Sequence, residues 1–318
     1  MEFKDLKKII GSYWASRAII TAVELDIFTK IHRGINNIKD LARECKASIR
    51  GMEALITYLI SIELIEEKER GLEISKEALF LSSLFPQNKL GWVNHQKNLF
   101  YRWCKLTEAV RKGRPVKDKF DLKSFILAME QGKEIDPSVL KTLPLEEEFK
   151  LLDLGGGPGT YSVLFLENFP KSQVTLFDLP EVINFDKKVL PEKILKDKRF
   201  KMLKGDFLKD PLGKGYDYIW LSSVIHSYGK KEIEKLIKKC SESLNKKGKI
   251  FVLDYFLNDD KKGPPFSALF SLNMLVNTKN GKTYSFKEVE EILLKYGFSE
   301  FQRLPFQENN SVLIGTLL

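Results

Sequence analysis

An acidic residue and a cluster of spaced glycines form the first group of residues that could do chemistry. The segment Asp153-Leu-Gly-Gly-Gly-Pro-Gly159 follows a short apolar run and precedes an amphipathic segment, the order expected of a strand, a tight turn and a helix. Glycines let the backbone turn sharply and approach a ligand closely, because they carry no Cβ. The start of the following helix would present unpaired N–H groups and a positive dipole end to that ligand.

A second acidic residue indicates a nucleotide-like ligand. Asp178 ends the next apolar run, about 20 residues after the glycines, where a carboxylate can bind the two hydroxyls of a ribose. The dinucleotide fingerprint G-x-G-x-x-G is not met, because Thr160 stands at its third glycine position. The spacing D-x-G-x-G-x-G is similar instead to the first motif of class I methyltransferases that use S-adenosylmethionine (SAM). We therefore favour SAM binding, with a plain tight turn as the alternative.

Candidate residues also follow the third, fourth and fifth predicted strands. Asp206 and Phe207 suit an adenine, because a carboxylate can bind its amino group and an aromatic face can cover its ring; a simple turn is the alternative. His226 follows the fourth strand and Asp254 closes the fifth. A carboxylate that orients a histidine and stabilises its cation is a common base arrangement, although a lone histidine is usually structural.

The elements that must position these residues alternate between strand and helix from residue 149 onward. This alternation predicts a mostly parallel sheet covered on both faces, with the ligand at the carboxyl ends of the strands near the switch point. After a helix at 285–296, the runs 298–304 and 311–317 can pair as a hairpin at the sheet edge. The predicted strands are 149–154, 173–177, 200–203, 216–221 and 249–254, and the predicted helices between them are 159–168, 181–190 and 230–245.

The first part of the chain predicts helices and one hairpin, the order of a winged helix. A winged helix can bind DNA or serve packing and dimerisation. The tip of the hairpin holds three glutamates beside Lys68 and Arg70, which makes a poor phosphate clamp, so we favour dimerisation. The predicted helices are 3–31, 38–44, 50–62, 92–112 and 121–131, and the predicted hairpin is 65–74.

Length, charge and cysteine content set further bounds. The 318 residues suffice for two domains, and no apolar run reaches the length of a transmembrane helix. The net charge of +9 comes from lysines spread along the chain, which fits solvated helix faces better than a nucleic-acid surface. Cys45, Cys104 and Cys240 are far apart and odd in number, as expected of reduced cytoplasmic thiols and not of a disulfide framework or a zinc site.

Several motifs in the same order make the chain similar to a known family. Residues from about 10 to 318 resemble the O-methyltransferases that join a winged-helix dimerisation domain to a SAM-dependent domain, such as the caffeic acid and acetylserotonin O-methyltransferases. The matching segments are Asp153-Leu-Gly-Gly-Gly-Pro-Gly159, Phe177-Asp-Leu-Pro-Glu-Val182, Gly205-Asp-Phe207, His226-Ser-Tyr228 and Asn280-Gly-Lys-Thr-Tyr-Ser285.

The resemblance implies an α/β fold with a Rossmann-like class I SAM methyltransferase domain and an N-terminal α-helical winged-helix dimerisation domain. We expect the dimerisation domain at residues 1–90, a helical linker that lines the active site at 91–145, and the SAM-dependent domain at 146–318. A homodimer through the N-terminal domain is expected. That domain also carries many apolar residues, Tyr13 and Trp14 among them, and an exposed apolar surface marks an interface.

The resemblance also implies roles for single residues. Thr283 stands where the plant enzymes carry a second supporting glutamate, and Ser222 stands where a lysine often flanks the adenine. The expected catalytic residues are His226 and its supporting Asp254, the expected cofactor contacts are Asp153, Gly155, Gly157, Asp178, Asp206, Phe207 and Ser222, and the expected acceptor contacts are Met129, Phe270, Asn273 and Met274.

We therefore expect a cytoplasmic enzyme that moves a methyl group from SAM to a hydroxyl of a small aromatic or quinone-like acceptor, leaving S-adenosylhomocysteine. His226 would act as the general base, and no metal, nucleic acid or stable membrane insertion is expected. Two other functions stay open. The first is carbon methylation, or other SAM-dependent chemistry, on a ring substrate. The second is a SAM-binding winged-helix regulator.

Overall fold

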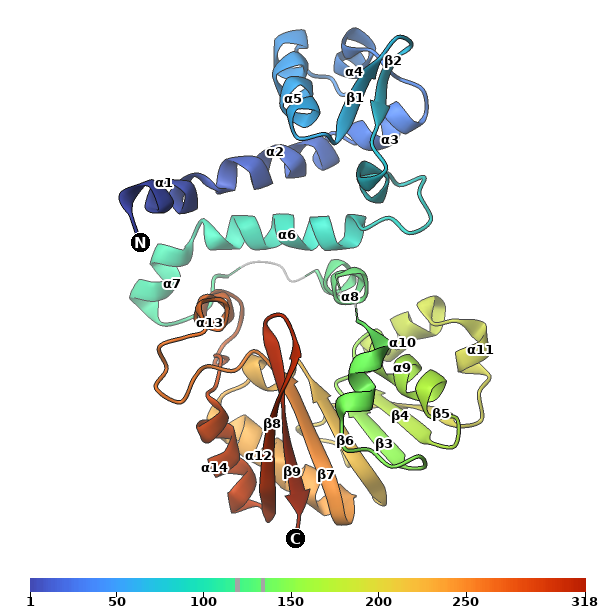
Figure 1. Cartoon of the computed structure of the whole chain (residues 1–318), viewed down its shortest axis with the longest axis vertical. Coiled ribbons are helices and arrows are strands. Elements are labelled where there is room, and N and C mark those ends of the chain that lie inside the picture. Colours follow the sequence, from blue (N-terminus) through green and yellow to red (C-terminus); the bar gives the residue numbers. More distant parts are fainter. Residues whose placement is uncertain (118–120, 133–134) are drawn as a thin grey trace. The chain divides into compact units, whose positions relative to one another are not determined.

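The chain forms two units in the computed structural model, which describes residues 1–117, 121–132 and 135–318. The first unit comprises residues 1–99 and 121–132, and the second comprises the remaining described residues. Figure 1 labels the helices and strands of both units.

The first unit is helical with one β-hairpin. Five helices precede the hairpin, whose strands pair antiparallel from Ile65 opposite Ile74 to Lys68 opposite Gly71, so the predicted hairpin is confirmed. Its elements are α1 (Phe3–Gly11), α2 (Tyr13–Glu24), α3 (Ile27–His32), α4 (Ile38–Glu44), α5 (Ile49–Ser61), β1 (Ile65–Lys68), β2 (Gly71–Ile74), η1 (Glu77–Leu81), the first part of α6 (Leu90–Trp103) and α8 (Leu122–Gln131).

Side-chain caps and one apolar core hold these helices. Asn37 accepts the N–H of Asp40 to begin α4, and Ser48 accepts the N–H of Gly51 to begin α5. Each cap satisfies a donor that a helix start otherwise leaves unpaired. Residues from α2 through η1 then meet in a core that includes Phe28 and Met52, both almost fully buried.

The prediction of one helix over residues 3–31 is wrong, because the chain breaks twice there. The hydroxyl of Ser12 donates to the carbonyl of Ile9 where α1 ends. Asp26 takes a left-handed conformation with φ of 56° between α2 and α3, which a short polar side chain tolerates better than a bulky one. α1 is consequently a separate helix in which no residue is buried.

A seven-stranded sheet forms the centre of the second unit, and its strand order is β5-β4-β3-β6-β7-β9-β8. The first five strands pair parallel, and β9 pairs antiparallel with both β7 and β8, which confirms the predicted α/β class and the C-terminal hairpin. The strands are β3 (Lys150–Leu154), β4 (Gln173–Asp178), β5 (Phe200–Lys204), β6 (Tyr216–Ser222), β7 (Leu244–Asp254), β8 (Phe298–Gln307) and β9 (Asn310–Leu317).

Helices cover both faces of this sheet, as strand alternation requires. Along β6, Ile219 and Leu221 join one apolar core, whereas Tyr218 and Trp220 join the other. Successive side chains of a strand point to opposite faces, so a strand buried on both sides reads as a continuous apolar run. The helices of this unit are α7 (Leu106–Lys112), η2 (Pro137–Thr142), α9 (Thr160–Asn168), α10 (Pro180–Val189), α11 (Glu192–Leu195), η3 (Ile225–Ser227), α12 (Lys230–Ser243), α13 (Pro265–Asn277) and α14 (Phe286–Lys295).

The strand order places a topological switch point at β3. This strand pairs with β4 on one side and with β6 on the other, so the connections that leave their carboxyl ends diverge. A crevice at this position is where open α/β sheets bind their ligands.

The prediction of one helix over residues 92–112 is also wrong. α6 ends at Trp103 and α7 begins at Leu106, because Lys105 leaves the helical conformation with φ of −101° and ψ of 13°. Trp103 donates its indole N–H to Asn273 of α13, and α7 also contacts α13. The bend therefore lets both segments reach the same helix of the second unit.

Candidate active site

The glycine loop, residues 155–159, connects the end of β3 to α9. Gly155 and Gly157 both take left-handed conformations, with φ of 71° and 56°. Nothing lies within 4 Å of the position that a Cβ on Gly157 would occupy, so the backbone is open there. The N–H of Gly157 donates to Oδ2 of Asp178 at 2.8 Å, which joins the loop to the end of β4.

The carboxylate of Asp178 has the geometry of a diol-binding group. Its Oδ1 accepts the N–H of Leu179 at 2.7 Å, and each oxygen keeps a further lone pair. Burial raises the pKa of this carboxyl above its ordinary value, and the two N–H groups oppose that rise by stabilising the ionised form. An ionised, partly buried carboxylate is suited to accept hydrogen bonds from two adjacent ribose hydroxyls.

Asp206 and Phe207 lie in the turn that follows β5. Oδ1 of Asp206 accepts the N–H of Leu208 at 2.9 Å, and Oδ2 lies 2.7 Å from the ammonium of Lys209. These contacts lower the pKa of the Asp206 carboxyl. The ring of Phe207 is buried and meets the ring of Tyr228 edge to face at 5.4 Å.

Phe207 also lies beside the glycine loop, since its ring comes within 3.5 Å of the Cβ position of Gly155. The structure thus brings together an open glycine backbone, a carboxylate at the next strand end and an aromatic ring with a second carboxylate. These groups fit the adenosyl part of SAM.

Asp153 and Ser222 are the two remaining predicted cofactor residues. Asp153 is fully buried, and its Oδ2 accepts the hydroxyl of Ser162 of α9 at 2.7 Å. This contact braces β3 against the helix that follows the glycine loop. Ser222 is buried at the end of β6.

His226 and Asp254 are in direct contact. Nδ1 of His226, in the short helix η3 after β6, lies 2.7 Å from Oδ1 of Asp254 at the end of β7. Oδ1 also accepts the N–H of Tyr255 at 2.8 Å. The relative exposure of His226 is 8% and that of Asp254 is 3%, so both groups are largely shielded from water. A carboxylate in this position fixes the imidazole with its proton on Nδ1 and leaves the lone pair on Nε2.

An aromatic cluster, formed by Tyr255, Phe266 and Phe270, lies beside this pair. The ring of Phe270 meets the imidazole of His226 edge to face, with 4.9 Å between their centroids. Tyr255 lies 4.5 Å from Phe270 and 5.2 Å from Phe266. Tyr255 was not predicted as a site residue, and its only sequence signal is that it directly follows Asp254 at a strand end.

Asn273 and Met274, on the same helix α13, follow Phe270. Oδ1 of Asn273 accepts the indole N–H of Trp103 at 2.9 Å and the amide N–H of Asn277 at 2.9 Å. Because an indole N–H can only donate, these contacts fix which amide atom is oxygen and leave the NH₂ group as donor. Met274 is buried. The fourth predicted acceptor contact, Met129, lies half-buried on α8 of the first unit and stays a prediction.

The backbone of His226 is packed against a residue that sequence reasoning missed. A Cβ on Gly281 would lie 2.3 Å from the carbonyl oxygen of His226 and 2.9 Å from the carbonyl carbon of Ser227. The hydroxyl of Tyr284 donates to the carbonyl of Tyr228 at 2.8 Å, just beyond. The segment 280–285 therefore supports the turn that carries His226. Its Asn-Gly dipeptide signals a turn but not what the turn touches.

Thr283 does not take up the position of a second support for the base. Its hydroxyl donates to the carbonyl of Ser267 in α13 at 3.0 Å, and its relative exposure is 2%. The hydroxyl therefore ties the segment 280–285 to α13.

Within the described ranges, three features concern metals, membranes and disulfides. No group of three or more His, Cys, Asp and Glu side chains is arranged to hold a metal ion. None of the described helices is long and apolar enough to cross a membrane. Cys45, Cys104 and Cys240 are free thiols.

Comparison with known proteins matches both parts of the chain. A family model described as an O-methyltransferase domain matches residues 103–299, and a model described as an O-methyltransferase dimerisation domain matches residues 7–81. The chain is 26% identical to the acetylserotonin O-methyltransferase of Homo sapiens, over 94% of this chain and 93% of that relative. It is also 26% identical to TcmO of Streptomyces glaucescens, a tetracenomycin polyketide synthesis 8-O-methyl transferase, over 98% of this chain and 96% of that relative.

A solved structure shows the same fold. The crystal structure of human N-acetylserotonin methyltransferase in complex with SAM aligns with a TM-score of 0.84 at 24% identity, covering 99% of this chain and 97% of that one. The two family models follow each other along this chain without overlap, and the O-methyltransferase domain model spans more than half of it. The chain therefore belongs to the family of SAM-dependent O-methyltransferases that carry an N-terminal dimerisation domain.

Proposed function

We propose that this enzyme transfers the methyl group of SAM to a hydroxyl on a small aromatic or quinone-like acceptor, with His226 as general base. The observation that carries this proposal is the buried contact between His226 and Asp254, 2.7 Å long, beside the ring of Phe270. A base next to an aromatic surface suits an acceptor that presents an acidic hydroxyl on a ring. The names of the two matched relatives, which both specify an oxygen, support oxygen as the methylated atom.

The residues proposed to hold SAM lie at the ends of β3, β4 and β5. Asp178 would bind the ribose hydroxyls, and Asp206 and Phe207 would bind the adenine. The glycine loop at Gly155 and Gly157, whose backbone is open at Gly157, would lie against the cofactor. Asp153 and Ser222 would support this region from within the sheet. When bound, SAM supplies a methyl group on a positively charged sulfur, which an electron-rich oxygen attacks.

The proposed role of His226 is to make the acceptor oxygen electron-rich. A phenol resembles a tyrosine side chain, with a pKa of about 10, and is a poor nucleophile at neutral pH. With Nδ1–H donated to Asp254, Nε2 of His226 takes the phenolic proton, and the Asp254 carboxylate stabilises the resulting cation. General-base assistance of this kind is worth about 10²–10⁴ in rate, and correct positioning supplies much of the remainder.

The aromatic and amide side chains of α13 support an acceptor ring with an oxygen substituent. The aromatic cluster and Met274 would contact the ring. Asn273 would donate its amide N–H groups to an oxygen on the acceptor, because Trp103 and Asn277 already occupy its Oδ1. A carbonyl or quinone oxygen suits such a donor.

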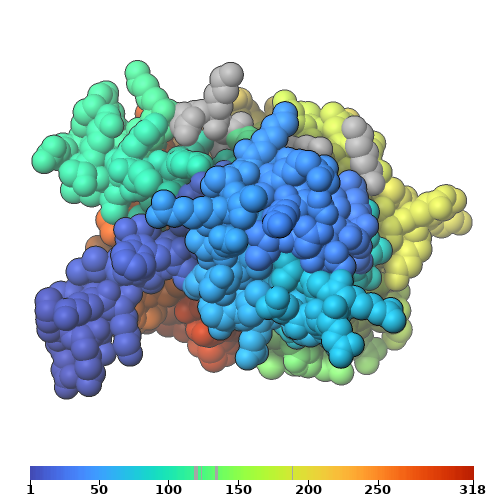
Figure 2. Space-filling view, turned by 90° about the horizontal axis from the view of Figure 1, so that it is seen from above, coloured from blue at the N-terminus to red at the C-terminus, as the bar shows by residue number. Residues whose placement is uncertain are grey.

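We propose that the enzyme is a homodimer, assembled through the predicted N-terminal domain at residues 1–90. The match to a dimerisation domain over residues 7–81 supports this assembly. In Figure 2, the darkest blue residues, those of the N-terminal helix, extend beyond the lighter blue remainder of the first unit. That helix, α1, exposes Leu6, Ile9 and Ile10 at relative exposures of 40%, 58% and 64%. These residues recur at helical spacing and form one unburied apolar face.

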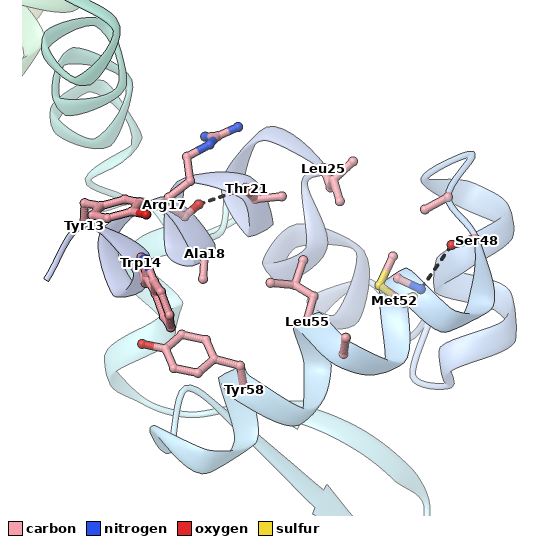
Figure 3. A pocket seen from close by; sticks show the side chains of 13 residues that line it. Tyr13, Trp14, Arg17, Ala18, Thr21, Leu25, Ser48, Met52, Leu55 and Tyr58 are labelled. Atoms are coloured by element: carbon pink, nitrogen blue, oxygen red, sulfur yellow. Dashed lines mark hydrogen bonds between the residues drawn. The ribbon is translucent and has the colours of Figure 1, made fainter. Parts of the chain in front are cut away.

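An apolar groove in the same unit is the proposed receiving surface for the second copy. The groove has a volume of about 650 Å³ and lies between α2 and α5. Figure 3 shows Trp14 of α2 directed toward Tyr58 of α5, with Leu55 farther along α5. The exposed ring of Trp14, at 70% relative exposure, would be buried in a dimer.

The free thiols agree with the proposed cytoplasmic location.

The reaction can be tested with purified full-length protein, labelled SAM and a panel of phenols, hydroxyquinones and their methyl ethers. We expect label on the phenolic oxygen, with a methyl ether identified by mass and by NMR. Label on a ring carbon would contradict O-methylation and establish carbon methylation. Salt-sensitive binding to random duplex DNA, with no labelled product from any acceptor, would favour a regulator instead.

A further inference from the structure

One lysine of α12 holds the turn that follows β5. The ammonium group of Lys239 donates hydrogen bonds to the main-chain carbonyls of Phe207 and Asp210. Asp206 and Phe207, proposed to hold the adenine, lie in the same turn. Lys239 therefore binds the backbone of the turn and not the side chains that would face the cofactor.

The turn also has internal hydrogen bonds. The carbonyl of Asp206 accepts the N–H of Lys209 at 2.8 Å and the N–H of Asp210 at 2.7 Å. Oδ2 of Asp210 accepts the N–H of Asp206 at 2.8 Å. These bonds close the turn on itself but do not attach it to α12. Phe207 shares an apolar core with residues of that helix, and Lys239 adds hydrogen bonds from the helix to the turn.

The helix that carries Lys239 is a rigid base. Its inner face places Leu236, Ile237 and Cys240 in the core of the second unit, each with a relative exposure of 1% or less. Burial, together with the nearby charge of Lys235, lowers the pKa of Lys239 from its ordinary value. Burial and the charge of Lys235 thus disfavour the charged form of the Lys239 ammonium, and the hydrogen bonds to the two carbonyls favour it.

We propose that Lys239 is a positioning residue for the cofactor, which holds the turn so that the Asp206 carboxylate and the Phe207 ring receive the adenine in one fixed orientation. This inference rests on the proposed function, which assigns the adenine to that turn. Lys239 does not touch the cofactor in this scheme and takes no part in proton transfer. Its loss should weaken adenosine recognition and leave acceptor binding and the chemical step unchanged.

The affinities of two closely related ligands test this role directly. S-adenosylhomocysteine carries an exocyclic amino group that can donate to Asp206, whereas S-inosylhomocysteine carries a carbonyl oxygen that a carboxylate repels. The ratio of the two dissociation constants measures how well the carboxylate is placed. A loss of overall stability alone would not change this ratio.

The experiment measures both ligands by calorimetry, with kcat and the acceptor KM at saturating SAM, on the full-length enzyme. For Lys239→Met we expect S-adenosylhomocysteine to bind about 5- to 20-fold more weakly, which corresponds to about 1–2 kcal/mol. The preference over the inosyl ligand should fall, while kcat and the acceptor KM stay near the wild-type values. Lys239→Arg should restore most of the affinity, because a guanidinium can donate to both carbonyls. The neighbouring Lys238→Met is the control, since the Lys238 side chain is 63% exposed and its ammonium lies 3.9 Å from Glu242.

Two results would overturn the inference. One is a Lys239→Met enzyme with wild-type affinity and wild-type preference between the two ligands. The other is a fall in kcat and thermal stability together with a rise in the acceptor KM, with the ligand preference intact, which would mean a general structural role. If Lys239→Met does not fold, Lys239→Gln keeps an amide donor on a shorter stem and should show an intermediate loss of preference.

Asp206→Asn and Phe207→Ala test the assignment of the adenine to this turn separately. Wild-type affinity in both variants would show that the adenine does not bind this turn, whatever the effect of Lys239.

Discussion

Nδ1 of His226 lies 2.7 Å from Oδ1 of Asp254, and the same oxygen accepts the N–H of Tyr255. The Asp254 carboxylate is thus held by a main-chain N–H as well as by the imidazole. Its second oxygen lies 3.4 Å from the backbone nitrogen of His226, which adds a weaker contact to the same residue. Asp254 therefore fixes both the backbone and the ring of the proposed base.

Replacing the base tests the proposed chemistry. In His226→Ala we expect kcat to fall by about 10²–10⁴, because the acceptor hydroxyl loses its proton acceptor. SAM affinity should stay near the wild-type value, since the imidazole acts on the acceptor. Activity should recover as pH rises toward the acceptor's own pKa, because an ionised phenolate needs no base. Steady-state kinetics from pH 6 to about pH 10, with calorimetry for SAM, measure both effects.

His32→Ala is the control for this experiment. His32 lies in the first unit, and its Nδ1 contacts the hydroxyl of Ser82 at 2.9 Å. Wild-type turnover is expected. Wild-type turnover in His226→Ala at neutral pH would contradict the general-base proposal and leave positioning of an already ionised or carbon nucleophile as the chemistry.

Asp254→Asn should have a smaller effect than loss of the base. The amide can still accept the N–H of Tyr255, but it carries no charge to stabilise the imidazolium and can present an N–H to Nδ1. We expect kcat to fall by less than the factor of about 10²–10⁴ expected for His226→Ala, because the imidazole stays in place but loses the charge that stabilises its cation. Measured kcat equal to that of the wild type would show that the carboxylate does not support the base.

Gly281 gives a test that leaves the side chain of His226 in place. In Gly281→Ala the new Cβ would meet the carbonyl oxygen of His226 at 2.3 Å, so the turn that carries His226 and the segment 280–285 must shift apart. We expect kcat to fall by at least about tenfold, as small displacements of catalytic groups cost large factors. SAM affinity should change little. With an acceptor that is already ionised, the loss should shrink, which distinguishes a displaced base from a damaged fold.

Lys279 is exposed and lies two residues before Gly281, so Lys279→Ala is the matched control and should keep wild-type kinetics. If Gly281→Ala kept the wild-type kcat on an un-ionised acceptor, the packing against His226 would not be needed for its position.

Asp178 should be required for SAM. Asp178→Ala removes a charged acceptor of two ribose hydrogen bonds, which we put at about 1.5–3 kcal/mol, or about 10- to 150-fold in affinity. Calorimetry on a variant that remains folded by circular dichroism measures this loss. Unchanged affinity would refute the assignment of the ribose to this carboxylate.

The raised pKa of Asp178 also predicts a pH dependence of stability. Burial makes the folded state bind this proton more tightly than the unfolded state does, so ionising the carboxyl at neutral pH costs stability. As pH falls through the raised pKa toward the ordinary value of about 3.9, that cost is relieved. Without SAM, the Tm of the wild type should therefore rise relative to that of Asp178→Asn as pH falls. A Tm difference that does not depend on pH would contradict this account.

The apolar face of α1 predicts the effect of two substitutions on assembly. The double variant Ile9→Glu and Ile10→Glu places two charges on the face proposed to meet the second copy, where burying them unpaired is costly. We expect the dimer to dissociate, measured by sedimentation velocity. Lys4→Glu and Lys8→Glu change the charge of the opposite face of the same helix and should leave the dimer intact. A double variant with the wild-type sedimentation coefficient would exclude α1 from the interface.

Local patterns in the sequence predicted the class of fold and the glycine loop after β3. The hydrophobic periodicity of a strand or helix is a local property, because it depends on which side chains of one segment are buried. Along β6, for example, alternate residues join opposite apolar cores, as expected of a strand that is buried on both faces. The glycine loop followed by Asp178 at the next strand end is also a local pattern. The first break of the predicted helix 3–31 follows Gly11, whereas the second, at Asp26, has no Gly or Pro beside it, so periodicity alone did not reveal it.

The contacts between residues that are far apart in the chain could not be predicted from local patterns. The contact of His226 with Asp254 depends on the pairing of β6 with β7, whose register sets Ser222 beside Leu253 and so brings both strand ends together. The packing of Gly281 on His226 and the bonds of Lys239 to the turn after β5 join segments that follow no common period. Such contacts arise from the direction in which loops leave a sheet, and a residue pattern within one segment carries no record of that direction.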